Sequence, residues 1–396
     1  MPANNGAISK ERILMVHNFY QIGGGEHTVF ENEKKLLREN GHYLAEYTRD
    51  NTELNESRIK KILLPFTAVF SFKTYREIKK IIRKEKIDIV HCHNTFPLIS
   101  PAVYYAAWNC GVPVVQTIHN FRFLCPNGVF FSAGKVCEDC LHKGLHCGIK
   151  KGCYRNSRIQ TIVVANMLTV HRLLGTYKKL RYIFLTDFNK KKFHKLLGSK
   201  VKHEFIKPNF EYIDLPAYNV EKNESFVFVG RLEENKGITF LLDAWRNNNR
   251  DLYIFGDGTY KDDVIQAGKN NPFIHYMGFR PQNEIFEYIQ KSKALIFPSE
   301  LYEGFPMTLI EAFSLGTPVI CTDIGNGADI VKKAKAGVAF KLHSLDDFNK
   351  AILKIDCDVE MYSQNARETY ERFYTPDENY KQLKSIYKTV INKNGE

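Results

Sequence analysis

Residues 294–318 have the sequence ALIFPSELYEGFPMTLIEAFSLGTP, and this stretch decides the predicted fold. Its first four residues are apolar and predict a buried strand that ends at Pro298. Pro306 suits the first position of a helix, and residues 316–318 supply the helix stop. Glu303 therefore lies in the loop after the strand, and Glu311 lies on the helix.

This loop and the helix start combine two carboxylates with a seat for a phosphate. The first-turn amides of Met307, Thr308 and Leu309 have no partners inside the helix, so they can hold a phosphate. Carboxylates such as Glu303 and Glu311 accept hydrogen bonds from sugar hydroxyls. Each glutamate alone would be an ordinary capping or solvated residue, but the group predicts a ligand that carries hydroxyls and phosphate.

The first half of the chain alternates between predicted strands and helices. A strand is expected at residues 13–17, followed by a glycine-rich loop with Gly24 and Gly25 and a helix over residues 28–37. Further strands are expected at residues 87–91, 112–119 and 182–186. This alternation predicts a doubly wound parallel sheet, which binds ligands beyond the carboxyl ends of its strands.

His119 lies at the predicted binding edge, because it ends the strand over residues 112–119. A lone histidine at a strand end is more often structural, and His17 and His93 are weaker candidates. We also expect His91 to point away from His93, so that only one of them faces the binding edge.

The second half repeats this plan. A strand at residues 226–229 leads into a loop that begins with Gly230 and contains two cations, Arg231 and Lys236. Arginine can fork onto phosphate oxygens and lysine adds a point charge, so the pair can neutralise a diphosphate. Two solvated loop cations are the ordinary alternative. Glycine turns at Gly256 and Gly278 follow the next two apolar segments.

The segment from Glu303 to Glu311 resembles the E-x7-E motif of the retaining glycosyltransferases of family 4, also called group 1 glycosyltransferases. The resemblance spans nearly the whole chain, although Pro306 stands where many members have a second glycine. It implies the GT-B architecture, in which two doubly wound parallel-sheet, Rossmann-like domains face a central cleft. The final helix, over residues 378–391, is expected to cross back to the first domain.

The resemblance also implies roles for the residues that match. Glu303 would contact the donor sugar and Glu311 the ribose, while Arg231 and Lys236 would stabilise the departing diphosphate. His119 would line the catalytic cleft near the sugar. The implied reaction moves a sugar from a nucleotide-diphosphate sugar to a glycan or polyprenyl-linked acceptor with retention, without a catalytic metal. The donor would also contact Gly24, Gly25, Gly230, Gly256, Gly278, Met307, Thr308 and Leu309.

Length and composition predict two domains. The 396 residues are 44% hydrophobic, enough for two cores of about 200 residues each. We expect an acceptor-binding domain over residues 1–207, with a cysteine-rich insertion at about residues 122–156. A nucleotide-sugar-binding domain would follow over residues 208–374, and residues 375–396 would form the returning helix.

Charge differs between the two halves. Residues 1–207 hold 34 Lys+Arg and 16 Asp+Glu, a net charge of +18, which leaves −6 for the rest of the total of +12. Basic clusters such as residues 58–61 and 79–84 predict an anionic membrane surface as a partner. A solubilising surface is the alternative, and no recognition motif supports nucleic acid. The polar start and the lack of an apolar run of about 18 residues predict a cytoplasmic protein at the inner face of the membrane.

Five of the nine cysteines fall within residues 125–153. A close pair with distant partners is typical of a four-coordinate structural zinc site, and a reducing cytoplasm favours metal over disulfides or free thiols. The predicted ligands are Cys125, Cys137, Cys140 and Cys153, with Cys147, His142 and His146 as spare candidates.

Residues 356–358 spell D-x-D, a metal–nucleotide motif of another glycosyltransferase fold, but no strand precedes them, so we interpret them as a helix junction. Two rival functions remain open. One is a sugar-nucleotide epimerase of the same architecture, and the other is a non-enzymatic, zinc-stabilised protein that binds membrane or nucleic acid.

Overall fold

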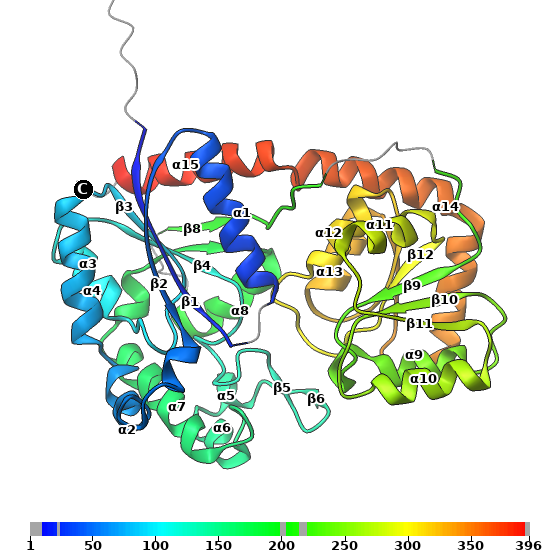
Figure 1. Ribbon diagram of the computed structural model, residues 1–396, viewed down its shortest axis with the longest axis horizontal. Coiled ribbons are helices and arrows are strands. Elements are labelled where there is room, and N and C mark those ends of the chain that lie inside the picture. The colour runs from blue at the N-terminus through cyan, green and yellow to red at the C-terminus, as the bar shows by residue number, and fades with distance from the viewer. Residues whose placement is uncertain (1–9, 22–23, 199–202, 214–219, 393–396) are drawn as a thin grey trace, which may run out of the picture. The chain divides into compact units, whose positions relative to one another are not determined.

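A computed structural model describes residues 10–21, 24–198, 203–213 and 220–392. The chain forms two compact units (Figure 1). The first contains residues 1–119, 145–207 and 380–396, and the second contains residues 120–144 and 208–379. Gly23, part of the predicted glycine-rich loop, lies outside the described residues.

The first unit is built on a parallel six-stranded sheet in the order β2-β1-β3-β4-β7-β8. Its strands are β1 (Arg12–Phe19), β2 (Tyr43–Asp50), β3 (Ile89–Asn94), β4 (Val114–Ile118), β7 (Arg181–Phe184) and β8 (Glu204–Ile206). Its helices are α1 (Gly25–Glu39), α2 (Arg58–Thr67), α3 (Phe72–Lys84), α4 (Ala102–Trp108), α6 (His146–Lys151), α7 (Arg158–Leu173) and α8 (Asp187–Leu197), with short 3-10 turns η1 (Asn51–Leu54) and η2 (Thr176–Lys179).

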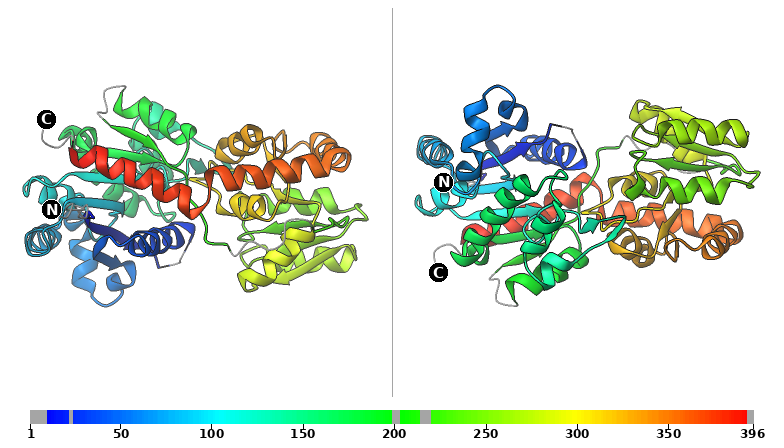
Figure 2. Two further views of the ribbon diagram at one scale, coloured as in Figure 1. Left: turned by 90° about the horizontal axis from the view of Figure 1, so that it is seen from above. Right: turned by 90° about the horizontal axis from the view of Figure 1, so that it is seen from below.

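The last helix, α15 (Pro376–Asn392), closes the core of the first unit. Its side chains Leu383, Tyr387 and Val390 are buried against Ile13 of β1 and Phe30 of α1. Figure 2 shows this helix lying along the first unit. The predicted return of the final helix to the first domain is therefore confirmed.

The second unit repeats the parallel sheet in the order β11-β10-β9-β12-β13-β14. Its strands are β9 (Phe226–Val229), β10 (Leu252–Phe255), β11 (Ile274–Gly278), β12 (Ala294–Phe297), β13 (Val319–Thr322) and β14 (Gly337–Phe340). Its helices are α9 (Ile238–Trp245), α10 (Lys261–Asn270), α11 (Gln282–Lys291), α12 (Met307–Ser314), α13 (Gly325–Ala334) and α14 (Leu345–Phe373), preceded by the 3-10 turn η3 (Glu234–Lys236).

Strand order determines where each unit can bind a ligand. In the second unit the winding direction reverses between β9 and β12, and in the first unit it reverses between β1 and β3. In open parallel sheets, ligands bind beyond the carboxyl ends of the strands at such a reversal. The loops after these four strands are therefore the candidate binding loops.

The insertion differs from its predicted place. We expected residues 122–156 in the first domain. Residues 120–144 group with the second unit instead, whereas residues 145–156 lie in the first unit as predicted. Residues 120–144 contain a short antiparallel hairpin, β5 (Phe131–Ser132) and β6 (Lys135–Val136), followed by α5 (Asp139–His142).

The D-x-D triplet lies inside α14, where Asp358 has non-helical backbone angles and kinks the helix. Asp356 pairs with Arg250 and Lys293 at 2.9 and 3.0 Å. Both observations agree with a helix junction. No helix in the described part of the chain is long and apolar enough to cross a bilayer.

Candidate active site

At the reversal point of the second unit, an ion pair joins Lys236 to Glu303. The Lys236 ammonium lies 2.5 Å from Oε1 of Glu303, and the Ser299 hydroxyl donates to the same oxygen at 2.9 Å. Their side chains are only 19% and 16% exposed. The carboxylate is therefore held in one orientation while remaining accessible to a ligand.

The backbones of the two loops that carry this pair are tightly packed. Gly237 has a φ of +74°, and a Cβ there would lie 2.0 Å from the Pro298 carbonyl oxygen, so only glycine fits. The Glu300 amide donates to the Asn235 carbonyl at 3.0 Å. The Asn326 side chain donates to the Gly304 carbonyl at 2.9 Å and fixes the far end of the loop. These contacts fix the distance between the cation and the carboxylate.

Helix α12 begins at Met307, and Pro306 is its N-cap with an extended ψ of 101°. The expectation that Pro306 is the first helical residue is therefore wrong by one position. The Leu309 amide donates to the Pro306 carbonyl at 3.2 Å, so it is already engaged. Met307 and Thr308 keep the first-turn amides that can receive an anion, since no helical carbonyl precedes them.

Glu311 faces a different environment on the same helix. Burial and the nearby Glu211 carboxylate raise its pKa to about 7, while a hydrogen bond from the Gln282 amide at 3.2 Å opposes this shift. A carboxyl group with this pKa changes its charge near neutral pH. It can therefore accept a hydroxyl hydrogen bond at pH 8 more strongly than at pH 6.

The predicted glycine turns are stacked against one another. The Gly256 amide donates to the Gly278 carbonyl at 2.9 Å, and a Cβ on Gly256 would lie 1.9 Å from the Gly230 carbonyl oxygen. Arg231, which follows Gly230 in the chain, is exposed. Of the predicted residues in the second unit, Lys236 and Glu303 are in direct contact, Arg231 lies in the same loop as Lys236, and Glu311 lies on α12 beside Gln282.

The insertion contacts these loops within the second unit. The Phe130 ring packs edge-on against Tyr302, with ring centroids 6.3 Å apart. Burial and a hydrogen bond to Glu138 raise the pKa of Tyr302 to about 12. A Cβ on Gly134 in the hairpin turn would lie 3.6 Å from a carboxylate oxygen of Glu234. Sequence reasoning missed these contacts because no local pattern encodes them.

In the first unit, His119 follows β4 and contacts His93 at the end of β3. The distance from His93 Nδ1 to His119 Nε2 is 2.9 Å, and the two rings are stacked. Burial and the neighbouring His93 keep the pKa of His119 well below its usual value, so the ring is neutral at pH 7. Burial also lowers the pKa of His17 to about 2.

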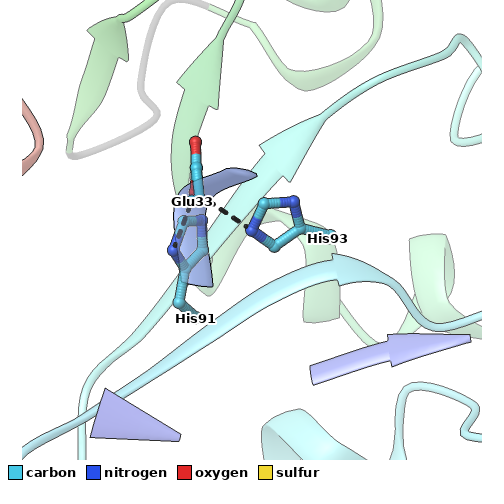
Figure 3. A group of neighbouring side chains, drawn as sticks. All are labelled: Glu33, His91 and His93. Atoms are coloured by element: carbon cyan, nitrogen blue, oxygen red, sulfur yellow. Dashed lines mark ion pairs between the residues drawn. The ribbon is translucent and has the colours of Figure 1, made fainter. Parts of the chain in front are cut away.

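The expectation that His91 and His93 point in opposite directions is wrong. Their ring centroids lie 4.4 Å apart, because residues two positions apart on a strand share a face. Both approach Glu33 on α1, at 3.8 Å for His91 Nδ1 and 3.2 Å for His93 Nε2 (Figure 3). Lys207 contacts the other Glu33 oxygen at 2.6 Å.

Glu33, His91 and His93 form the only group of three or more potential metal ligands found among the described residues. However, Lys207 already supplies the cation for Glu33, and both nitrogens of His91 have hydroxyl partners, on Tyr387 and Thr117, each at 2.7 Å. The group is therefore explained as a buried hydrogen-bonded ion pair.

Gly24 and Gly25 of the predicted glycine-rich loop lie at the start of α1, the helix that carries Glu33. Gly24 is the N-cap of α1 with an extended φ of −157°, and no atom lies within 4 Å of a Cβ built there. Glu33 and Lys207 were not identified from the sequence. A signal existed for Glu33, since it shares the buried helix face with Phe30 and Leu37 at helical spacing.

Comparison with known proteins identifies the class of this chain. Residues 215–372 match the family described as glycosyl transferases group 1, and residues 22–134 match glycosyltransferase family 4. The chain belongs to this family of glycosyltransferases. Over 340 residues it is 26% identical to an Escherichia coli protein, covering 81% of this chain and 80% of the relative. That relative is named UDP-Gal:alpha-D-GlcNAc-diphosphoundecaprenol alpha-1,3-galactosyltransferase.

Solved structures support the same fold. Sucrose-phosphate synthase from Thermosynechococcus elongatus superposes with a TM-score of 0.69 at 15% identity, covering 97% of this chain and all of that one. The Anabaena protein HepE in complex with UDP-glucose gives a TM-score of 0.64 at 13% identity, covering 96% of this chain and all of HepE. The predicted GT-B fold class, with two Rossmann-like domains, is confirmed.

The raised pKa of Glu311 predicts a pH-dependent stability. The folded protein binds a proton at this carboxyl more tightly than the unfolded chain, so Glu311 costs stability above pH 7 and this cost disappears as the pH falls. From pH 8 to pH 5, the free energy of unfolding of the wild type is expected to rise by about 1 to 3 kcal/mol relative to Glu311→Gln. Urea unfolding at each pH measures this. The exposed-site variant Glu360→Gln serves as control. If the free energies of unfolding of wild type and Glu311→Gln change equally with pH, the raised pKa of Glu311 is contradicted.

Proposed function

We propose that this glycosyltransferase moves a sugar from a nucleotide-diphosphate sugar to a glycan or polyprenyl-linked acceptor of a cell-surface polysaccharide. The observation that carries this proposal is the contact between Lys236 and Glu303 beside the start of α12. A cation and a carboxylate beside helix-start amides, at the strand reversal of one sheet, support a site for a ligand that carries hydroxyls and phosphate. The names of the relative and of the HepE complex, which mention UDP-Gal and UDP-glucose, support a nucleotide-sugar donor.

In the proposed reaction, charge develops on the departing diphosphate. Arg231, Lys236 and the Met307 and Thr308 amides would stabilise that charge, and Glu303 would accept hydrogen bonds from the donor sugar. Glu311 would accept hydrogen bonds from the ribose. The Lys236 ammonium would exchange part of its contact with Glu303 for the phosphate when donor binds. We propose retention of the anomeric configuration from the resemblance to the retaining enzymes, and the anomeric NMR signal of the product tests it.

We propose that the protein works at the inner face of the cell membrane, with α2 as the contact. None of the residues of α2 is buried, and its apolar side chains fall on one face at helical spacing. Ile62 and Phe66 are 71% and 74% exposed, and Ile59 and Leu63 are also exposed. Arg58, Lys60 and Lys61 are exposed on the same helix. An apolar face flanked by cations fits an anionic bilayer, which accepts both.

We further propose that the insertion binds structural zinc. The Cys140 side chain hydrogen-bonds to Cys125, and this contact outweighs burial to lower the pKa of Cys125 to about 7, with help from the amides of Asn127, Gly128 and Phe130. A thiol that favours the thiolate suits a zinc ligand. The four predicted cysteines do not form a ligand cluster in the described part of the chain, since the Cys137 thiol donates to Asp139 at 3.6 Å and Cys153 belongs to the other unit. Cys125 and Cys140 are the pair on which the proposal rests.

The donor proposal is tested with UDP, GDP, ADP and dTDP. One diphosphate is expected to raise the melting temperature, since saturation at 100 times the Kd adds about 2.7 kcal/mol of stability. With the matching sugar nucleotide, Lys236→Ala and Arg231→Ala are expected to lower kcat by about 10²- to 10³-fold, because each removes one charge contact to the leaving group.

The exposed-site variant Lys269→Ala is the control for these lysine and arginine changes. Near-normal turnover in both site variants would overturn the roles given to Arg231 and Lys236. Conversion of the sugar nucleotide without any acceptor would instead identify an epimerase.

The membrane proposal is tested by flotation with vesicles of phosphatidylcholine and phosphatidylglycerol. Ile62→Glu is expected to reduce binding about tenfold, because it puts a charge on the inserted face and repels anionic lipid. The matched control is Leu353→Glu, whose leucine is 60% exposed in the second unit. Equal binding by both variants, or binding insensitive to salt, would contradict the contact.

The zinc proposal predicts about one bound zinc per chain in protein purified without chelator. Cys140→Ser is expected to lose that metal and to melt at a lower temperature, because structural zinc contributes folding free energy. Wild-type protein that contains no metal and has fully titratable cysteines would end the proposal.

A further inference from the structure

A buried chain of polar contacts connects Lys207 to His119 in the first unit. Lys207 Nζ lies 2.6 Å from Glu33 Oε1, Glu33 Oε2 lies 3.2 Å from His93 Nε2, and His93 Nδ1 lies 2.9 Å from His119 Nε2. The side chains of Lys207, Glu33 and His93 are completely buried. Buried polar groups are costly unless they interact, so this chain has a defined arrangement of charges and protons.

The charge of Glu33 fixes the first proton in the chain. Burial opposes ionisation of Glu33, but Lys207 and His93 outweigh it and hold the pKa of this carboxyl well below its usual value. An ionised carboxylate can only accept hydrogen bonds. Among the described side chains, neither Glu33 Oε2 nor His93 Nε2 has a hydrogen-bond partner, so their 3.2 Å contact is electrostatic. The negative carboxylate attracts an N–H and repels a ring lone pair, so the hydrogen of His93 belongs on Nε2.

The charge of Lys207 fixes the remaining protons. Lys207 already balances Glu33, so a second buried cation on His93 would have no counter-charge. A neutral His93 with hydrogen on Nε2 has a lone pair on Nδ1. His119 must then donate its Nε2 hydrogen to His93, which leaves Nδ1 of His119 as an acceptor. The other groups nearby do not change this, because burial keeps His17 and His91 neutral.

We propose that Glu33, Lys207 and His93 are positioning residues that hold His119 as the neutral tautomer with hydrogen on Nε2. His119 then presents the Nδ1 lone pair, which accepts a hydrogen bond from a hydroxyl of the sugar substrate. This inference rests on the proposed function for its substrate, but the tautomer itself is a property of the protein alone. Neither Glu33 nor Lys207 contacts substrate in this proposal, since both are fully buried.

Glu33→Gln tests the proposal because glutamine keeps the shape of glutamate and inverts the hydrogen-bond order. Its carbonyl accepts from Lys207, so its NH₂ faces His93 Nε2. His93 then carries its hydrogen on Nδ1 and donates to His119 Nε2, and the hydrogen of His119 moves to Nδ1. We expect ring-¹⁵N-labelled protein to show His119 protonated at Nε2 in the wild type and at Nδ1 in Glu33→Gln.

The His119 signal is assigned by its loss in His119→Asn. Activity provides the second measurement, and we expect kcat to fall at least about tenfold while the KM for the donor changes little. An Asp→Asn change that sets the wrong histidine tautomer in serine proteases lowers kcat by about 10⁴-fold. The matched control is Glu31→Gln, on the same helix, whose side chain is 45% exposed. It is expected to leave both the NMR pattern and kcat unchanged.

Glu33→Gln leaves Lys207 as an unpaired buried charge, which can prevent folding, so a second variant is needed. Glu33→Gln combined with Lys207→Met removes both charges. In this double variant we expect that His119 is no longer protonated at Nε2 alone, and that kcat is reduced. The proposal is overturned if wild-type His119 carries its hydrogen on Nδ1. It is also overturned if either folded variant keeps the wild-type tautomer and turnover. Absence of any transfer by the wild type would defeat the proposed function, whereas the NMR result would still decide the tautomer.

Discussion

Parallel strand pairing is the constraint on which the rest of this protein depends. Every strand of the two six-stranded sheets pairs in parallel, so each connection returns through a helix or loop and all carboxyl ends within a sheet meet at one edge. In the second unit this geometry brings the loop after β9 to the loop after β12, and so brings Lys236 to Glu303. In the first unit it brings the end of β3 to the end of β4, and so His93 to His119.

Two lysine–glutamate pairs use the same chemistry for different purposes. The pair of Lys236 and Glu303 is partly exposed, so a ligand can enter and exchange contacts with it. The pair of Lys207 and Glu33 is fully buried, where removing one partner leaves an uncompensated charge and costs about 3 to 5 kcal/mol. The first pair suits binding and charge stabilisation. The buried pair suits a structural role, because its charges cannot move and so orient the histidines packed against it.

Sequence patterns predicted the parts of the fold that carry strong local signals. The apolar run of β12, the cation loop after β9 and the glutamates around α12 were all found at their observed places. Strand β2 was missed because it lies at the sheet edge and only one of its residues is buried, which weakens the apolar pattern. Residues 120–144 of the insertion were assigned to the wrong unit, because the contact of Phe130 with Tyr302 joins residues far apart in the chain.

The sequence by itself determined the parallel α/β class, the family and the candidate residues of the second unit, because these depend on local periodicity and on short spacings. Only the tertiary structure decided that Glu33 pairs with Lys207, 174 residues away, and that His91 and His93 share one face beside them. A charged residue on a buried helix face shows that a partner is needed, but its identity depends on the order of the strands. That order results from packing over the whole sheet, which no local stretch of sequence contains.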